Sequence, residues 1–284
     1  MILVTGATGT TGSEVVRQLT ARGEKVRALT RDPRRARITP RVETVRGDYA
    51  DPDSLEAAMT GVTAAYLVGP PGPGADHDRA LVAAARAAGV GRLVKLSAIG
   101  VDDAATGPSG RWHAEGERAV RESGAQWTLL RPSSFASNAL AWAEAVRRGE
   151  PVPNMTGDGP SGVIDPRDIA EVAVRALLDT AHAGRTYTLT GPEAISVPDQ
   201  TAVLSAVLGR PLTVRTLSPD ETRDFLRTAW GFDETRAQDV LTGLTYVRDG
   251  HNATVTADVP EVLGRAARSF LEWAEDNKSH FGAR

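Results

Sequence analysis

The chain opens with an apolar segment that runs directly into regularly spaced glycines. Residues Ile2–Thr5 are apolar or β-branched, and an amphipathic stretch over Ser13–Arg22 begins soon afterwards. Between them stand Gly6, Gly9 and Gly12. Apolar and β-branched runs favour strands, while an amphipathic stretch of this length favours a helix. The order strand, glycine turn, helix constrains the fold strongly, because it is the first half of a strand–helix–strand unit with parallel strands.

The same alternation continues through the first half of the chain. Six segments have the apolar character of strands: Ile2–Thr5, Lys25–Thr30, Val42–Arg46, Ala64–Val68, Arg92–Ser97 and Trp127–Arg131. Amphipathic stretches alternate with them: Ser13–Arg22, Pro52–Met59, Asp76–Ala88 and Trp112–Ser123. Near-continuous apolar strands are typical of a parallel sheet that helices cover on both faces. The sequence therefore predicts an α/β fold with a Rossmann-type, doubly wound parallel sheet.

The opening glycines have the properties that a pyrophosphate site needs. Gly6 permits a tight turn, Gly9 lets backbone N–H groups approach a phosphate, and Gly12 lets the helix pack closely on the strand. The helix N-terminus adds a partial positive charge, and neighbouring threonines add hydroxyl groups at the rim. The GxxGxxG spacing in this setting predicts that a dinucleotide binds to Gly6, Thr8, Gly9, Thr10, Thr11 and Gly12.

The end of the second strand indicates which dinucleotide is preferred. A site that prefers NAD usually carries an acidic residue there, about 20 residues past the glycines, which binds the ribose 2′-hydroxyl. In this chain Arg31 follows the strand, with Arg34 and Arg35 close behind. A guanidinium binds a 2′-phosphate with paired hydrogen bonds, whereas a carboxylate repels it. We therefore expect Arg31 and Arg35 to favour NADP(H) over NAD(H), with Asp32 serving the ribose hydroxyl as the alternative.

Further cofactor contacts are expected where the other strands end, because the carboxyl ends of parallel strands meet at one edge. The third strand end is expected near the adenine, the fourth beneath the middle of the cofactor, and the fifth near the nicotinamide ribose. The residues concerned are Asp48 and Tyr49, then Val68, Gly69 and Pro70, and finally Ser97. For each of them a capping or turn role is the alternative.

The regular alternation weakens after Pro132. The elements expected there are helices at Phe135–Arg148 and Ile169–Asp179 and strands at Arg185–Thr190 and Leu212–Thr216. From Gly191 onward the pattern is otherwise mostly helical. We predict an NAD(P)-binding Rossmann domain over residues 1–190 and a smaller, mostly helical C-terminal lobe over 191–284 that covers the substrate. Residues 133–165 of the first domain are expected to contribute to the substrate cleft.

Several segments resemble the short-chain dehydrogenase/reductase superfamily. The glycine opening, VRALTRD and GDYADPDSL carry that resemblance, and HAEGERAVRESGAQWTLLRPSSFASN (113–138) and GVIDPRDIAEVAVRAL (162–177) narrow it. The latter two are similar to the atypical NmrA-like group, especially its bacterial NAD(P)H:quinone oxidoreductase-like members and relatives that reduce triphenylmethane dyes. The resemblance implies a nicotinamide cofactor and hydride transfer. It covers nearly the whole chain, and beyond about residue 190 it is diffuse.

The usual catalytic pair of that superfamily, Tyr-x-x-x-Lys, does not occur in this sequence. Four places after the tyrosines stand Asp53, Pro70, Gly191 and Gly250. His113 and Glu117 occupy the place where the pair should fall, as in the quinone-reductase-like branch. With a reference pKa near 6.5, His113 is the candidate catalytic proton donor, and a structural role near a helix start is its alternative. Glu117 is expected either to orient His113 or to face water.

Hydride transfer without that pair remains possible when the acceptor is already electron-poor, because proximity and orientation then supply most of the catalysis. We therefore predict an NADP(H)-dependent oxidoreductase that reduces a quinone or a similar conjugated aromatic compound. Two alternatives stay open. One is a redox sensor of the NmrA type that binds NADP(H) without turnover, and the other is a tailoring enzyme for aromatic polyketides.

The resemblance also implies a substrate cleft after the sixth strand. Arg131-Pro132 is similar to the LRP element of the family, whose proline packs near the nicotinamide. Ser133, Phe135 and Asn138 follow and are expected to line the cleft, where the Phe135 ring either stacks on a flat substrate or packs in the core. The loop over 155–162 carries three glycines and is expected to act as a mobile lid.

Composition excludes several other classes of function. The chain has no cysteine, and its five histidines form no HxxxH or HxH pair, so neither disulfides nor a metal site are predicted. A net charge of −3, and arginines at 31–41 without interleaved aromatics, argue against a nucleic-acid partner. The apolar opening is too short for a signal peptide or a membrane span. We therefore predict a cytoplasmic protein, with no membrane partner, that is a monomer or a homodimer.

Overall fold

The computed structural model describes residues 1–69 and 76–282, which form two compact units. Unit 1 comprises Met1–Ala98, Trp112–Pro132 and Pro166–Thr188, and unit 2 comprises Ile99–Arg111, Ser133–Asp165 and Leu189–Arg284. The segment predicted to contribute to the substrate cleft, 133–165, thus belongs to the second unit. The predicted division of the chain at residue 190 stays a prediction.

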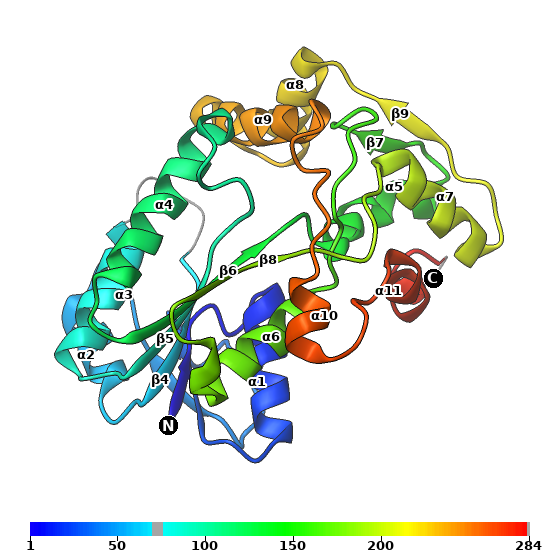
Figure 1. Cartoon of the computed structure of the whole chain (residues 1–284). Coiled ribbons are helices and arrows are strands. Elements are labelled where there is room, and N and C mark those ends of the chain that lie inside the picture. Colours follow the sequence, from blue (N-terminus) through cyan, green and yellow to red (C-terminus); the bar gives the residue numbers. More distant parts are fainter. Residues whose placement is uncertain (70–75, 283–284) are drawn as a thin grey trace. The chain divides into compact units, whose positions relative to one another are not determined.

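A seven-stranded sheet forms the centre of the Rossmann part of the chain (Figure 1). Its strands lie in the order β3-β2-β1-β4-β5-β6-β8. They are β1 Ile2–Val4, β2 Val26–Thr30, β3 Glu43–Arg46, β4 Ala64–Leu67, β5 Arg92–Leu96, β6 Gln126–Pro132 and β8 Arg185–Leu189. The pairs from β3 through β6 all run parallel. The strand order reverses between β1 and β4, which is the place where open parallel sheets bind ligands.

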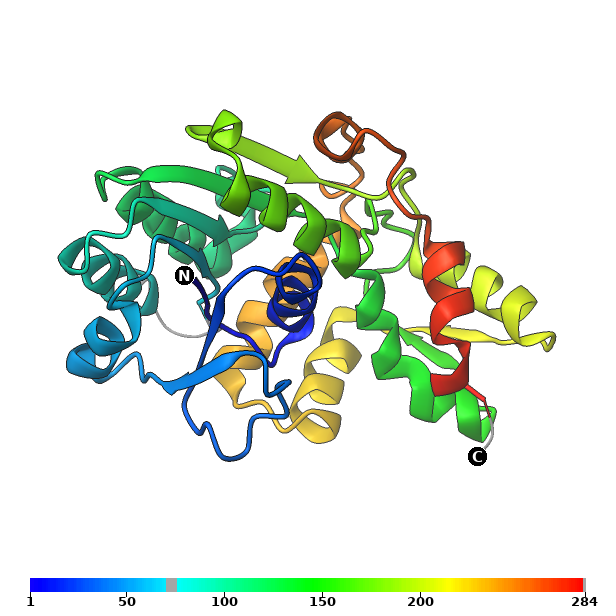
Figure 2. The same cartoon turned by 90° about the horizontal axis from the view of Figure 1, so that it is seen from below.

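Helices cover both faces of this sheet. They are α1 Thr10–Ala21, α2 Pro52–Met59, α3 Asp76–Ala87, α4 Gly107–Arg121 and α6 Pro166–Leu178, with the short turn η3 Thr180–His182 after α6. α1 and α6 pack side by side on one face, and α2 packs against α3 on the other (Figures 1 and 2). Leu3, Leu67, Leu93 and Leu129 from the strands are buried against Leu81 of α3. The predicted fold class, a doubly wound α/β sheet, is therefore confirmed.

Unit 2 is mostly helical and contains a parallel pair of strands, β7 Val152–Asn154 and β9 Val214–Thr216. Its helices are α5 Ala143–Arg148, α7 Val197–Leu208, α8 Pro219–Ala229, α9 Glu234–Arg248, α10 Asp258–Leu263 and α11 Phe270–Asn277, with short turns η1 Ala104–Thr106, η2 Ala136–Trp142 and η4 Lys278–His280. A serine begins α7, α8 and α11 with a capping box. Trp142, Val146, Phe270, Trp273 and Phe281 belong to one buried apolar cluster.

Three local predictions differ from the structure. The helix expected at Phe135–Arg148 is divided into η2 and α5, and Ser137 and Asn138 in its first half have a lower helix propensity than alanine or leucine. The helix expected from Trp112 already begins at Gly107. Strand β7 was missed because it has three residues and contains a proline. Within the described ranges, no helix is long and apolar enough to cross a membrane.

Candidate functional site

The glycine loop forms the tight turn between β1 and α1. Gly6 has a φ of 58°, in the left-handed region, and its carbonyl accepts the Gly9 N–H at 2.8 Å. A Cβ on Gly12 would lie 2.1 Å from the Gly6 carbonyl oxygen and 2.6 Å from its carbonyl carbon. These contacts are with backbone atoms, which cannot move aside as a flexible side chain does. The turn and the close approach of α1 therefore require glycine at positions 6 and 12.

The N-terminus of α1 has the features of an anion site. Gly9 is its N-cap and provides no side-chain acceptor, and the first turn contains no acidic residue. The first N–H groups of a helix have no partner within the helix, so they remain available to a bound anion. Thr8 and Thr10 are exposed at this end, as expected. Thr11 differs, because it is buried and its hydroxyl accepts the Tyr66 hydroxyl at 3.2 Å, away from the rim.

A groove in unit 1 brings the glycine loop and the arginine run together. Its volume is about 680 Å³, and Ala7, Thr8, Ser13, Thr30, Arg31, Asp32, Arg35, Ala36 and Arg37 line it. The Asp32 carboxylate accepts the backbone N–H of Arg34 at 3.0 Å and lies 3.5 Å from the Arg35 guanidinium. Arg31, in contrast, forms no ion pair with a carboxylate in the ranges 1–69 and 76–282. The positive charge of Arg31 is therefore not neutralised by a neighbouring carboxylate.

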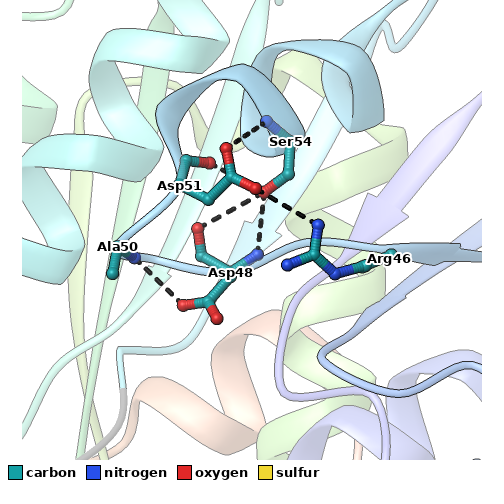
Figure 3. A network of polar contacts seen from close by, with 5 residues as sticks. All are labelled: Arg46, Asp48, Ala50, Asp51 and Ser54. Atoms are coloured by element: carbon teal, nitrogen blue, oxygen red, sulfur yellow. Dashed lines mark hydrogen bonds and ion pairs between the residues drawn. The ribbon is translucent and has the colours of Figure 1, made fainter.

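The turn after β3 is stabilised by its own polar groups (Figure 3). The Asp48 carboxylate accepts the Ala50 N–H at 3.1 Å, and the Asp48 N–H donates to the Ser54 hydroxyl at 3.0 Å. The Asp51 carboxylate caps α2 and pairs with Arg46 at 3.2 Å. The capping role that was the alternative for Asp48 is therefore present in the structure.

Residues at the end of β4 are held by hydrogen bonds to one residue that follows β1 and one that follows β3. The Thr5 hydroxyl accepts the Val68 N–H at 2.7 Å, and the Tyr49 hydroxyl donates to the Val68 carbonyl at 3.1 Å. Burial raises the pKa of Tyr49, so this hydroxyl keeps its proton. A Cβ on Gly69 would lie 2.8 Å from the Asp78 carboxylate, so glycine makes room for a buried acid here. Pro70 lies outside the described residues.

A buried ion pair lies beside these strand ends, and the sequence analysis missed it. Lys95 Nζ is 2.7 Å from Asp78 Oδ2, and the two side chains are 1% and 2% exposed. A Cβ on Gly116 would lie 2.1 Å from the same carboxylate oxygen. The sequence signal for such a pair was the lysine within the apolar strand RLVKL, since a buried ammonium needs a partner of opposite charge. The sequence does not show that this partner is Asp78.

Glu117 is the centre of a second buried polar cluster. It is 1% exposed, and it accepts the Ser97 hydroxyl at 2.6 Å and the Arg131 guanidinium at 2.8 and 2.7 Å. Arg121 also donates to it, at 2.9 Å. Burial raises the pKa of Glu117, but hydrogen bonds from Arg131 and Ser97 outweigh burial and hold it below its ordinary value. Glu117 therefore stays ionised and binds Ser97, Arg131 and Arg121, which is neither of the two roles expected for it.

His113 lies one helical turn before Glu117 in α4. Burial lowers the pKa of its imidazole to about 3, and the nearby positive charge of Lys95 acts in the same direction. The Trp112 ring stacks on it with the centroids 4.4 Å apart, and its Nδ1 is buried with no hydrogen-bond partner within the described chain. The imidazole is consequently neutral at neutral pH and carries no imidazolium proton to donate.

Unit 2 contains an apolar pocket of about 520 Å³. Phe135 and Asn138, both expected to bind substrate, line it together with Ser134, Ser137, Ala141, Trp142, Pro153, Met155, Thr156, Gly159, Ser161, Ile195, Val197, Gln200, Phe225, Trp230, Leu244 and Val247. Ser133 is not among the lining residues, because its buried hydroxyl bonds to Asn252 at 3.3 Å. Pro132 is buried at the end of β6 in unit 1. Phe225 was missed, because the resemblance is diffuse in that part of the sequence.

The loop over 155–162, expected to be a lid, is tied to its surroundings within unit 2. The buried Asn154 side chain donates to the Gly157 carbonyl at 2.9 Å, and Arg248 donates to the Met155 carbonyl at 2.9 Å. A Cβ on Gly159 would lie 2.1 Å from the Val247 carbonyl oxygen, so the loop packs closely against the end of α9. This loop is therefore a packed wall of the pocket.

Comparisons with known proteins agree with this architecture. A family profile described as NAD(P)H-binding matches residues 6–180. A (4-alkanoyl-5-oxo-2,5-dihydrofuran-3-yl)methyl phosphate reductase of Streptomyces griseus is 43% identical over 283 residues, covering 99% of each chain. An NAD(P)H azoreductase of Xenophilus azovorans is 38% identical over 286 residues, covering 100% of each chain.

A solved structure has the same fold over almost the full length. The NADPH-dependent quinone oxidoreductase of Escherichia coli, in complex with NADPH, superposes with a TM-score of 0.86 at 26% identity, covering 97% of this chain and 99% of that one. The family match spans more than half of the chain, and the relatives named above are reductases. The chain therefore belongs to the NAD(P)H-binding family, in the atypical, NmrA-like branch of the short-chain dehydrogenases/reductases, and is an NAD(P)H-dependent oxidoreductase.

Proposed function

We propose that this oxidoreductase transfers a hydride from NADPH to an uncharged, conjugated acceptor of the quinone type. The observation that carries the proposal is the protonation state of His113 and Glu117, the two residues that occupy the place of the Tyr-Lys pair. The pKa of His113 is lowered to about 3, and Glu117 is held ionised by two arginines. Neither group supplies a proton at neutral pH. A quinone suits such a site, because it accepts a hydride without prior protonation and its reduced oxygens take protons from water.

The proposal assigns the cofactor to the carboxyl edge of the sheet in unit 1. The N-terminus of α1, after its N-cap Gly9, offers uncapped N–H groups to the pyrophosphate, and Thr8 and Thr10 are exposed beside them. We infer a preference for NADP(H) over NAD(H), since Arg31 lines the adjoining groove without a carboxylate partner there, while Asp32 is engaged with Arg34 and Arg35. When bound, NADPH supplies the hydride from its nicotinamide ring.

Ser97 has a defined hydrogen-bond direction in this arrangement. Its hydroxyl proton points to Glu117 at 2.6 Å, so its oxygen is left as an acceptor. An acceptor oxygen suits the ribose hydroxyls or the carboxamide N–H of a nicotinamide nucleotide. It does not suit a substrate carbonyl, which needs a donor.

The acceptor is assigned to the pocket of unit 2, and the chemistry of the relatives supports its class. The relatives are named as an azoreductase and a furanone phosphate reductase, and the superposed structure is a quinone oxidoreductase. Each of these names describes the reduction of a conjugated system. The phosphate group of the furanone substrate is not carried over to this chain, because in the described part of the chain no arginine or lysine lines the unit 2 pocket.

Steady-state oxidation of NADPH with a panel of quinones and dyes tests the proposal. We expect turnover with uncharged quinones, and we expect His113→Asn to retain it within tenfold, because removal of a true general acid costs about 10²- to 10⁴-fold. Tight NADPH binding without oxidation by any acceptor would contradict the proposed hydride transfer to a quinone-type acceptor and favour the sensor alternative. A loss beyond a hundredfold in His113→Asn, with NADPH affinity unchanged, would restore the proton-donor role.

A further inference from the structure

We infer that the unit 2 pocket selects acceptors that carry an apolar extension, such as an alkyl chain, and that Trp230 and Phe225 determine this specificity. The inference rests on the proposed function. Among residues 1–69 and 76–282, the pocket lining contains no Asp, Glu, Lys, Arg or His, so a charged substituent would lose its hydration without gaining a partner. The cavity measures about 520 Å³. Cavities of roughly 300–1,000 Å³ enclose ligands much larger than a single quinone ring.

One wall of the pocket belongs to the core of unit 2. Trp142 and Ile195 line the pocket and are members of the buried cluster around Phe270 and Trp273, with exposed fractions of 7% and 9%. Because these side chains are fixed by core packing, this wall has a defined shape before any ligand binds.

The other wall comes from α8, α9 and the segment between them. Phe225, Trp230, Leu244 and Val247 line this side. Trp230 is 42% exposed, although tryptophan is normally well buried. Its ring packs edge-on against Phe225, with centroids 6.2 Å apart, and against Phe232 at 5.7 Å. An exposed aromatic cluster that borders a cavity marks a binding surface for apolar groups.

Polar contacts hold this aromatic wall in place. Arg227 pairs with Glu234 at 3.1 Å, which joins the end of α8 to the start of α9. The Arg236 guanidinium lies over the Phe232 ring at 4.3 Å from its centroid. A wall that is already ordered loses little conformational entropy when an alkyl chain binds against it.

The polar groups of the lining are neutral amides and hydroxyls. Asn138 and Gln200 contribute side-chain amides to the pocket, and neither amide hydrogen-bonds to another group within residues 1–69 and 76–282. Such groups donate to an uncharged carbonyl oxygen. The pocket therefore offers hydrogen bonds for a quinone carbonyl and apolar surface for a chain attached to the ring.

A homologous series of 2-alkyl-1,4-naphthoquinones, from methyl to hexyl, tests the inference with the wild-type enzyme and NADPH. We expect kcat/KM to rise about twofold to fourfold with each added methylene until the pocket is filled, since full burial of one methylene is worth about 0.8 kcal/mol. A naphthoquinone sulfonate of similar ring size is expected to be reduced at least tenfold less efficiently.

Trp230→Ala is expected to remove most of the chain-length dependence, lowering kcat/KM for the hexyl compound more than for the methyl compound, whereas Trp230→Phe keeps the dependence. Leu271→Ala is the matched control, because Leu271 is 46% exposed in α11 and does not line the pocket. Quenching of tryptophan fluorescence by the hexyl compound, measured without NADPH and therefore without turnover, gives a second readout. The apparent Kd of the hexyl compound is expected to be higher for Trp230→Ala than for the wild type.

The possible failures are distinguishable. If no quinone is reduced at all, the proposed function fails. If quinones are reduced with the same kcat/KM at every chain length, or if the sulfonate is reduced as well as the neutral compounds, the inference on specificity is overturned while the proposed function stands. An equal effect of Leu271→Ala and Trp230→Ala would also overturn it.

Discussion

Replacing Arg31 by alanine is the most direct test of the cofactor assignment. Arg31 is exposed and lines the groove that also contains Thr8 and Ser13. The nearest acidic side chain in sequence, Asp32, is engaged with Arg34 and Arg35, so Arg31→Ala leaves no buried carboxylate unpaired. The substitution therefore removes a ligand contact with little cost to folding.

The expected loss follows from the chemistry of the contact. A hydrogen-bonded contact to a charged group is worth about 1.5–3 kcal/mol, and exposure to solvent places this one near the lower end. A loss of about 1.5–2 kcal/mol weakens NADPH binding roughly 10- to 30-fold. NADH lacks the 2′-phosphate, so its affinity is expected to change by less than about twofold.

Calorimetric titration of NADPH and NADH at low and high salt measures both effects. Because the contact is between exposed charges, the gap between wild type and Arg31→Ala is expected to narrow at high salt. Arg41→Ala is the matched control, since it removes an exposed arginine from the same basic run outside the groove. Equal losses for both nucleotides, or an Arg41→Ala effect as large as that of Arg31→Ala, would refute the assignment of the 2′-phosphate.

Three further predictions follow from the geometry of unit 1. Gly12→Ala is expected to weaken the binding of NADPH and NADH equally, by more than about tenfold in calorimetry, because the new Cβ would lie 2.1 Å from the Gly6 carbonyl oxygen. Gly243→Ala is the control, because its Cβ would meet nothing within 4 Å. Unchanged binding in Gly12→Ala would contradict the close-packing argument. The pKa of His113 falls from an unfolded value near 6.5 to about 3, so the unfolded state binds more protons between these values and stability declines as the pH falls through this window. His113→Asn is expected to flatten the slope of the unfolding free energy against pH in this window. A slope identical to that of the wild type would argue against a buried neutral imidazole. Lys95→Met leaves the Asp78 carboxylate buried without its partner and should lower the free energy of unfolding by about 3–5 kcal/mol in urea titrations, whereas adding Asp78→Asn should recover part of that loss; strictly additive losses would show that the two groups do not interact.

Much of the fold could be predicted from the sequence, because its signals are local. Each apolar strand and each amphipathic helix is recognised within a short segment, and the backbone sterics at Gly6 and Gly12 act over a few residues. The same local reasoning identified Arg31 after β2 and the missing Tyr-x-x-x-Lys pair. These features are properties of short segments, so no knowledge of distant residues was needed to find them.

The protonation states and hydrogen-bond partners at the site depended instead on the tertiary structure. The bond between Ser133 and Asn252 joins residues 119 apart. Lys95 in β5 pairs with Asp78 in α3, and Glu117 in α4 accepts from Arg131 in β6. The walls of the unit 2 pocket come from segments between 134 and 247. Desolvation and charge pairing depend on what surrounds a group in space, so the sequence named His113 and Glu117 as candidates but only the folded chain made one neutral and kept the other ionised.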